Sequence, residues 1–219
     1  MMILILEVLK LISKQHITNK NKRLDVNMNP EFITIHSTGN EKSTPQNERD
    51  NLERSGNTSS TGFHYVVGED VIIECIPPTE KCYHAGDGKN GTGNSKSIGI
   101  EMVESGDRKK VIQNTVRLVK HLQQQFNISS KKVVRHYDWS KKNCPRILNN
   151  DGKWSDWWIF KTMIDDELPP IETVSKWASA SWEVATKLGV VDGTRPRESM
   201  TREEVITVLD RLGLFKYVD

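Results

Sequence analysis

Alternating apolar and polar side chains mark the first predicted strand. Residues 32–38 (FITIHST) alternate as a half-buried strand does and are followed by a turn at Gly39. Short apolar runs rich in β-branched residues predict further strands over residues 63–67, 71–75, 97–103 and 132–135. The glycine-containing segment 68–70 separates two of them by the length of a hairpin turn.

Apolar positions at helical spacing fill the gaps between these strands. Ile112, Val116, Val119, Leu122 and Phe126 form one apolar face, which predicts a long helix over residues 109–126. Residues 45–54 begin with a proline that suits a helix's first turn. Residues 154–164 predict another helix, whose Trp157, Trp158 and Phe160 we expect mainly in the core. Strands alternating with helices indicate an α/β or α+β domain, with a mixed central sheet flanked by helices.

Both ends of the chain differ from this central pattern. Residues 1–27 are expected to be an N-terminal extension, with a short apolar helix up to Ile12 and a polar surface loop from Asn19 to Asn29. Residues 166–170 (DELPP) predict a linker, because two prolines follow acidic residues. Beyond the linker, an apolar stripe and the capping box Thr201-Arg202-Glu203-Glu204 predict a small helical domain over residues 171–219.

Composition narrows the functional classes. The chain of 219 residues is long enough for one medium domain and a small appendage. Its 31 basic and 29 acidic residues give a net charge of +2, which argues against a nucleic-acid partner. We find no stretch long enough to cross a membrane, and charged residues interrupt the apolar start, so we expect no signal peptide.

Cysteine usage indicates synthesis in a reducing cytoplasm. The three cysteines, Cys75, Cys82 and Cys144, are too few and odd in number for a disulfide framework. Cys75 and Cys82 can in principle pair with each other, but two reduced thiols near strand ends are the favoured interpretation.

Three metal-binding side chains and one carboxylate occur at or near strand ends. His36 closes the first strand, His136 follows the last one, and Cys144 comes eight residues after His136 (144 − 136). Imidazole and thiolate are the ligands that zinc prefers, and three protein ligands leave one position open for water. Glu101, near the end of its strand, supplies a carboxylate that can carry the proton of that water.

Five ordered motifs give the chain a specific resemblance. They are residues 33–38, 62–67, 83–88 and 97–101, and the segment from His136 to Pro145. Together they resemble the zinc-dependent N-acetylmuramoyl-L-alanine amidases, a family that includes phage endolysins and bacterial autolysins and is related to peptidoglycan recognition proteins. The resemblance places a catalytic domain at residues 28–165.

The resemblance implies a role for each candidate residue. His36, His136 and Cys144 would be the ligands of a zinc ion, Glu101 the general base, and Lys142 a support for the oxyanion. Some relatives use a tyrosine where this chain has Phe63, which lacks the hydroxyl. His84 and Asn94 are expected to line the substrate groove together with Phe63, whereas His64 is expected to pack within the fold.

The implied substrate is bacterial peptidoglycan. The expected reaction cleaves the amide bond between the lactyl group of N-acetylmuramic acid and L-alanine of the stem peptide, which leads to cell-wall lysis. We expect synthesis in the cytoplasm and action at the wall, after release through a holin if the source is a phage. The tail starts with Trp177-Ala178, continues through a turn at residues 189–196 (GVVDGTRP) and ends with the helix that the capping box opens. In these features it resembles one S-layer homology repeat, which implies wall binding or self-association into a homo-oligomer.

Two other functional classes fit the sequence less well. A module that recognises peptidoglycan without cleaving it would have no need of Cys144 and Glu101. A structural zinc protein would use four protein ligands, often in Cys-x-x-Cys pairs, and the sequence contains none.

Overall fold

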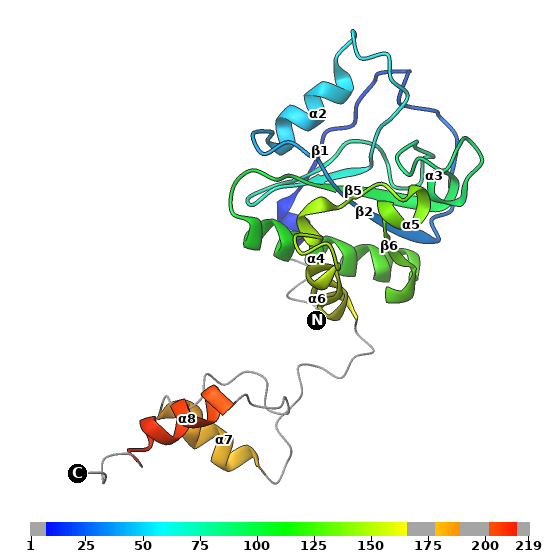
Figure 1. Ribbon diagram of the computed structural model, residues 1–219. Coiled ribbons are helices and arrows are strands. Elements are labelled where there is room, and N and C mark those ends of the chain that lie inside the picture. Colours follow the sequence, from blue (N-terminus) through cyan, green and yellow to red (C-terminus); the bar gives the residue numbers. More distant parts are fainter. Residues whose placement is uncertain (1–7, 166–177, 189–201, 214–219) are drawn as a thin grey trace. The chain divides into compact units, whose positions relative to one another are not determined.

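The structure is a computed structural model that describes residues 8–165, 178–188 and 202–213 (Figure 1). The chain divides into two compact units, residues 1–165 and 166–219. Each unit is described by itself below.

A six-stranded mixed sheet forms the centre of the first unit. Its strands lie in the order β1-β4-β3-β5-β2-β6. Only the β3–β4 hairpin is antiparallel, and every other neighbouring pair is parallel. The strands span Ile12–Lys14 (β1), Phe32–Ser37 (β2), Tyr65–Val67 (β3), Ile72–Glu74 (β4), Ser97–Met102 (β5) and Val133–Arg135 (β6).

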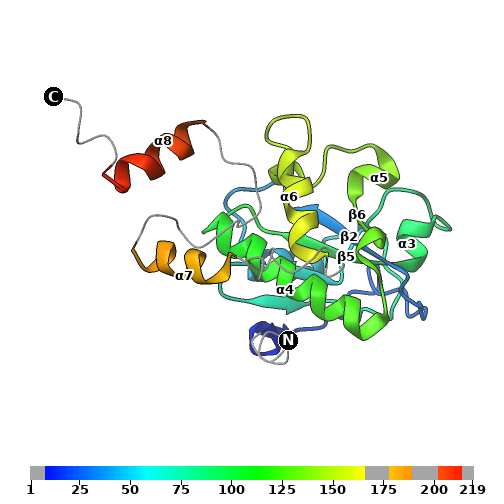
Figure 2. The same cartoon turned by 90° about the horizontal axis from the view of Figure 1, so that it is seen from below.

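Helices cover both faces of the sheet. Figure 1 shows α2 on one face and α4 with α6 on the other, and Figure 2 shows α6 beside α4. The helices span Pro45–Glu53 (α2), Thr92–Lys96 (α3), Arg108–Phe126 (α4), His136–Ser140 (α5) and Ser155–Ile164 (α6). The mixed α/β architecture expected from the sequence is therefore confirmed.

Helix α4 shows how local chemistry produces an element. Asp107 caps its start, because the carboxylate accepts hydrogen bonds from two backbone N–H groups of the first turn. Leu118, Val119 and Leu122 are buried at helical spacing and face the sheet. The helix ends where Asn127 adopts a left-handed conformation with φ of 54°.

The segment before residue 28 is part of the first unit. Residues 8–11 are helical, β1 pairs with β4, and Ile17 is fully buried. The expected polar surface loop is wrong for Lys22, which has no exposed area. Its ammonium group donates to the Asn57 side chain at 3.1 Å and to the Ser59 carbonyl at 2.6 Å.

Among the described residues, the predicted elements are confirmed to within a few residues, and five short ones were missed. The missed elements are β1, α3, α5 and two 3-10 helices, Ser130–Lys132 and Arg146–Leu148. Residues 1–7 of the first predicted helix lie outside the described residues. The expectation that Trp158 lies in the core is wrong, because 58% of it is exposed. Trp157 and Phe160 are buried as expected. The three cysteines are free thiols, as the sequence indicated.

The second unit is described only in two helices. They are α7, Ser179–Lys187, and α8, Arg202–Arg211. Both fall where helical periodicity was expected, whereas the linker and Trp177 lie outside the described residues. Exposed apolar side chains occur on or beside both helices, at Val184, Leu188, Val205, Ile206 and Leu212. Among the described residues, no helix has the length and apolar character needed to cross a bilayer.

Candidate active site and metal centre

Parallel strand pairing brings the candidate residues together. His36 and Glu101 are Cα partners in the β2–β5 register, so their side chains project from the same face of the sheet. On the other side of β2, Ile35 pairs with Arg135, and His136 begins α5 directly after that strand. Open α/β sheets bind ligands outside the carboxyl ends of their parallel strands, and this cluster lies at such an edge.

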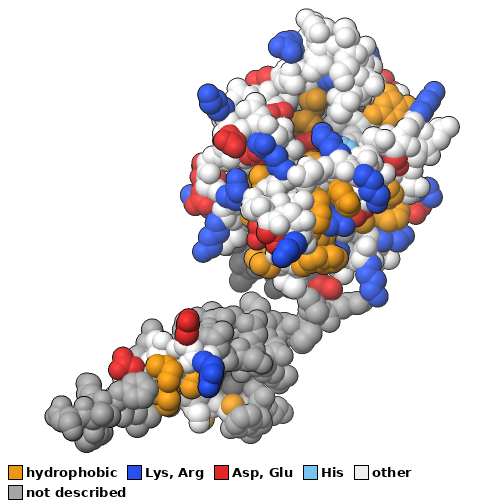
Figure 3. Space-filling view, in the orientation of Figure 1, with side chains coloured by type: hydrophobic (Ala, Val, Ile, Leu, Met, Phe, Trp, Pro, Cys, Tyr) orange, Lys and Arg blue, Asp and Glu red, His pale blue; other side chains and the backbone are white. Residues whose placement is uncertain are grey.

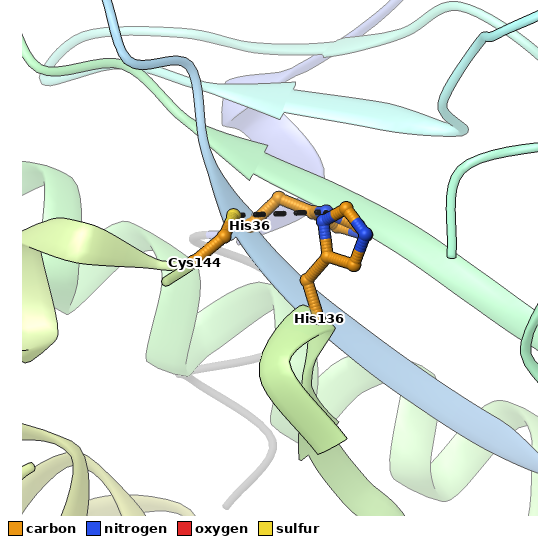
Figure 4. Close-up of side chains that lie close together, drawn as sticks. All are labelled: His36, His136 and Cys144. Carbon is orange, nitrogen blue, oxygen red and sulfur yellow. Dashed lines mark hydrogen bonds between the residues drawn. The ribbon is translucent and has the colours of Figure 1, made fainter. Parts of the chain in front are cut away.

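His36, His136 and Cys144 form a compact buried triad (Figure 4). Their ligand atoms lie within 4.8 Å of one another. Nδ1 of His36 is 3.0 Å from Nδ1 of His136 and 3.9 Å from Sγ of Cys144. A tetrahedral zinc ion would place its nitrogen and sulfur ligands about 3.3–3.6 Å apart, so the spacing of the triad fits such an ion.

The protonation chemistry of the triad also fits a cation. Burial lowers the pKa of His36 well below its usual range, and that of His136 to about 4, so both rings are neutral at pH 7. Burial, and then the charge of Glu101, raises the pKa of the Cys144 thiol to about 12. A bound metal ion would displace the thiol proton and make the side chain a thiolate ligand.

Glu101 lies beside the triad, and one of its two side-chain oxygens lacks a hydrogen-bond partner among the described residues. Its Oε1 is 3.9 Å from Nδ1 of His36, and the side chain is 18% exposed. Its Oε2 is buried and lacks a hydrogen-bond partner within the described part of the chain. Burial, aided by the charge of Glu48 and opposed by that of Lys142, raises the pKa of Glu101 to about 8. Such a group can exchange a proton near neutral pH.

Two adjoining hollows open beside His136, and the smaller one also reaches His36. One, of about 230 Å³, is lined by His36, Glu101, Leu52 and Phe63 among others. The second, of about 610 Å³, is lined by residues that include Tyr83, Gly88, Lys89 and Asn94. Both hollows share Thr61, His84, His136 and Lys142 in their linings. Figure 3 shows a histidine surface between basic side chains on this face.

Comparison with known proteins identifies the family. Residues 26–147 match the family model described as N-acetylmuramoyl-L-alanine amidase. This range contains His36, Glu101, His136 and Cys144. The chain belongs to this amidase family.

Similar proteins come from Bacillus. The amidase CwlA of Bacillus subtilis (strain 168) is 36% identical over 158 residues, which are 70% of this chain and 56% of CwlA. CwlH of the same strain is 38% identical over 149 residues, which are 67% of this chain and 58% of CwlH. The chain thus spans a little over half the length of these two relatives.

Solved structures show the same fold. The catalytic domain of XlyA, an amidase of Bacillus subtilis, superposes with a TM-score of 0.64 at 36% identity. The match covers 70% of this chain and 98% of that domain. PlyL superposes with a TM-score of 0.63 at 30% identity, covering 71% of this chain and 97% of PlyL.

The other candidate residues of this amidase-family chain lie around the two hollows. Phe63 lines the smaller hollow, Asn94 lines the larger one, and His84 and Lys142 line both. Lys142 is exposed, and its positive charge contributes to lowering the pKa of His36 and His136. His64 packs within the fold as expected, because its two ring nitrogens bond to the Gly99 N–H and the Glu80 carbonyl.

A salt bridge between the buried Glu104 carboxylate and the partly exposed Arg146 lies close to Cys144 in the chain and was not expected from the sequence. The Glu104 side chain, 1% exposed, accepts hydrogen bonds from Arg146 Nε at 2.9 and 3.0 Å and from the Gly39 N–H at 2.9 Å. The backbone N–H of Arg146 donates to the Ser37 hydroxyl, and the Ser37 N–H points at the Cys144 sulfur. In the sequence, the only signs of this salt bridge are that Glu104 follows a predicted strand and that Arg146 comes two residues after Cys144.

The Glu104–Arg146 pair should make part of the stability acid-sensitive. Burial alone would raise the pKa of Glu104, but hydrogen bonds from Arg146, Ser37 and Gly39 outweigh it and lower the pKa below 4.5. The associated stability is therefore complete above that value and is lost as the pH falls through the lowered pKa. Glu104→Gln should lower the free energy of unfolding by about 1–3 kcal/mol at pH 7. Below pH 4.5, the free energy of unfolding of this variant should fall less steeply with falling pH than that of the wild type.

Denaturant unfolding across the acidic range measures this effect. The matched control is Glu41→Gln, because Glu41 is 78% exposed and lies 3.7 Å from the same arginine. The control should behave as wild type. Equal losses in the two variants would contradict a supporting role for Glu104.

Proposed function

We propose that this chain is a zinc-dependent N-acetylmuramoyl-L-alanine amidase that hydrolyses peptidoglycan. The bond cleaved joins the lactyl group of N-acetylmuramic acid to L-alanine of the stem peptide. The observation that carries the proposal is the buried triad His36, His136 and Cys144 with the Glu101 side chain beside it, whose Oε2 has no hydrogen-bond partner among the described residues. Family membership supports the bond specificity.

Zinc held by the triad would supply Lewis acidity and a water that ionises near neutral pH. The residues of the chain supply the remaining functions. Glu101 accepts a proton from the attacking water at a carboxylate oxygen and later delivers it to the departing amine of L-alanine. The ammonium group of Lys142 faces the negative charge that develops on the carbonyl oxygen. The two adjoining hollows bind the substrate on either side of the scissile bond.

Phe63 cannot take part in acid–base catalysis, so we assign this role to Glu101. The phenyl ring is nearly buried in the smaller hollow and has no hydroxyl to share the proton transfer. Glu101 is 3.9 Å from His36 and has a free carboxylate oxygen on the same face. We infer that the proton passes through this one side chain.

The products of wall digestion test the reaction directly. Purified peptidoglycan treated with the full chain should release peptides with new free L-alanine amino ends, while the glycan strands keep their length. Mass spectrometry of the soluble fraction measures both. New reducing sugar ends without free L-alanine would contradict an amidase, and an unchanged wall would favour recognition without cleavage.

Two single variants should separate metal binding from proton transfer. Cys144→Ser replaces a thiolate with a much poorer ligand, so zinc content and activity should fall together. Glu101→Gln keeps the size of the side chain but removes the base, so zinc should remain while turnover falls by roughly 10²–10⁴-fold.

Zinc by atomic emission and dye release from labelled walls are the two measurements. Cys75→Ala is the matched cysteine control, because Cys75 is buried outside the triad and should leave both readouts unchanged. Full activity of Cys144→Ser would contradict the metal assignment. An unchanged rate in Glu101→Gln would move the proton transfer to another group.

We further propose that residues 166–170 act as a linker and that residues 171–219 hold the enzyme at the wall. Exposed apolar side chains on α7 and α8, among them Val184 and Ile206, support a surface that another molecule covers. Binding to the wall would raise the local substrate concentration without a new contact at the active site. Self-association of the tail is the alternative that the same surface allows.

A fragment ending at Asp165 tests the tail. It keeps the first compact unit and every proposed ligand, so it should fold, bind zinc and cleave purified peptidoglycan. It should be less efficient than the full chain on whole cells, as measured by turbidity loss. Sedimentation of both proteins tests self-association. Equal lysis of cells together with equal oligomeric state would contradict both proposed roles.

A further inference from the structure

A chain of ring nitrogens leads from a backbone carbonyl to the proposed metal site. Nε2 of His84 is 3.0 Å from the carbonyl oxygen of Ser97, and Nδ1 of His84 is 3.0 Å from Nε2 of His36. A carbonyl oxygen can only accept, so Nε2 of His84 must carry the hydrogen. In a neutral ring, Nδ1 of His84 is then an acceptor, and Nε2 of His36 must donate to it. His36 is thereby fixed in the tautomer that carries its hydrogen on Nε2, and the lone pair of its Nδ1 is free to bind a metal ion.

A second carbonyl acts on the other histidine. Burial lowers the pKa of His136, whereas the backbone carbonyl of Ala85, the residue next to His84, acts to raise that pKa. Nδ1 of His136 is 3.0 Å from Nδ1 of His36. Because Nδ1 of His36 is the acceptor in this pair, a cation bound to both rings would replace a hydrogen on Nδ1 of His136.

The pair His84-Ala85 is itself held rigidly. One oxygen of the Asn94 side chain accepts the backbone N–H groups of both residues, each at 2.7 Å. The amide nitrogen of Asn94 donates to the carbonyl of Gly88 at 3.1 Å. Gly99 lies under the His84 ring, and a Cβ atom there would approach the ring to 2.8 Å. Only glycine allows the ring to lie so close to β5.

We propose that His84, anchored together with Ala85 by Asn94, sets the tautomer of His36 and so presents its Nδ1 atom to the metal. The inference rests on the proposed zinc centre. His84 is then a positioning residue that acts through His36, and Asn94 acts through the backbone of His84 and Ala85. Hydrogen bonds of this kind to metal-binding histidines are typically worth about 10–100-fold in metal affinity.

Substitutions at His84 separate this role from simple packing. Asparagine places its amide oxygen where Nδ1 of the imidazole lies, so His84→Asn keeps the acceptor for His36. Glutamine places its amide group near the position of Nε2, so His84→Gln keeps the bond to Ser97 but leaves His36 without an acceptor. Zinc affinity should be near wild type in His84→Asn and about 10–100-fold weaker in His84→Gln and His84→Ala.

Zinc affinity is measured on the full chain by competition with a chromogenic chelator, and the His36 tautomer by ¹⁵N–¹H NMR of the imidazoles. Wild type and His84→Asn should show a hydrogen on Nε2 of His36, whereas His84→Gln should show mixed tautomers. His121→Gln is the control for loss of a histidine elsewhere, because His121 lies on α4. Thermal unfolding identifies any variant that fails to fold. The test then rests on the difference in zinc affinity between folded His84→Asn and folded His84→Gln.

The experiment distinguishes failure of the positioning role from failure of the proposed function. Equal zinc affinity in His84→Asn, His84→Gln and wild type would overturn the positioning role and leave the proposed zinc amidase intact. A wild-type chain without affinity for zinc would overturn the proposed function and this inference with it.

Discussion

The parallel pairing of β2 with its two neighbours is the constraint on which the site depends. One neighbour, β5, places Glu101 opposite His36, and the other, β6, ends where His136 begins. A register slip of one residue in β2 would turn His36 to the opposite face, among the isoleucines of the core. The apolar side chains that alternate with His36 and Glu101 therefore hold the chemistry in place, because burying them fixes the register.

Beyond the sheet, the site is held mainly by groups that carry no catalytic chemistry. The backbone carbonyl of Ser97 accepts a hydrogen bond from His84, and the Glu104–Arg146 pair holds the segment that carries Cys144. Arg135, just before His136, pairs with Asp138 at 2.6 Å and lies over the Trp154 ring at 4.4 Å. The ends of the strands are thus tied to α5 and to the start of α6, so the proposed ligands stand on rigid elements.

The sequence predicted those parts of the fold and site that depend on local pattern. His36 and Glu101 could be found because strand alternation and strand ends are visible in a short window. The burial of Lys22 and the exposure of Trp158 could not, because both depend on which distant segment covers them. Likewise, His84 could be named as a site residue, but its contact with His36 across 48 positions required the tertiary structure.

X-ray absorption at the zinc edge tests directly whether His36, His136 and Cys144 hold a zinc ion. We predict one sulfur at about 2.3 Å, two imidazole nitrogens at about 2.0–2.1 Å and a further light atom in the open position. The sulfur signal should disappear in Cys144→Ser. A zinc environment of nitrogen and oxygen alone in the wild-type chain, or one with two or more sulfurs, would contradict this set of ligands.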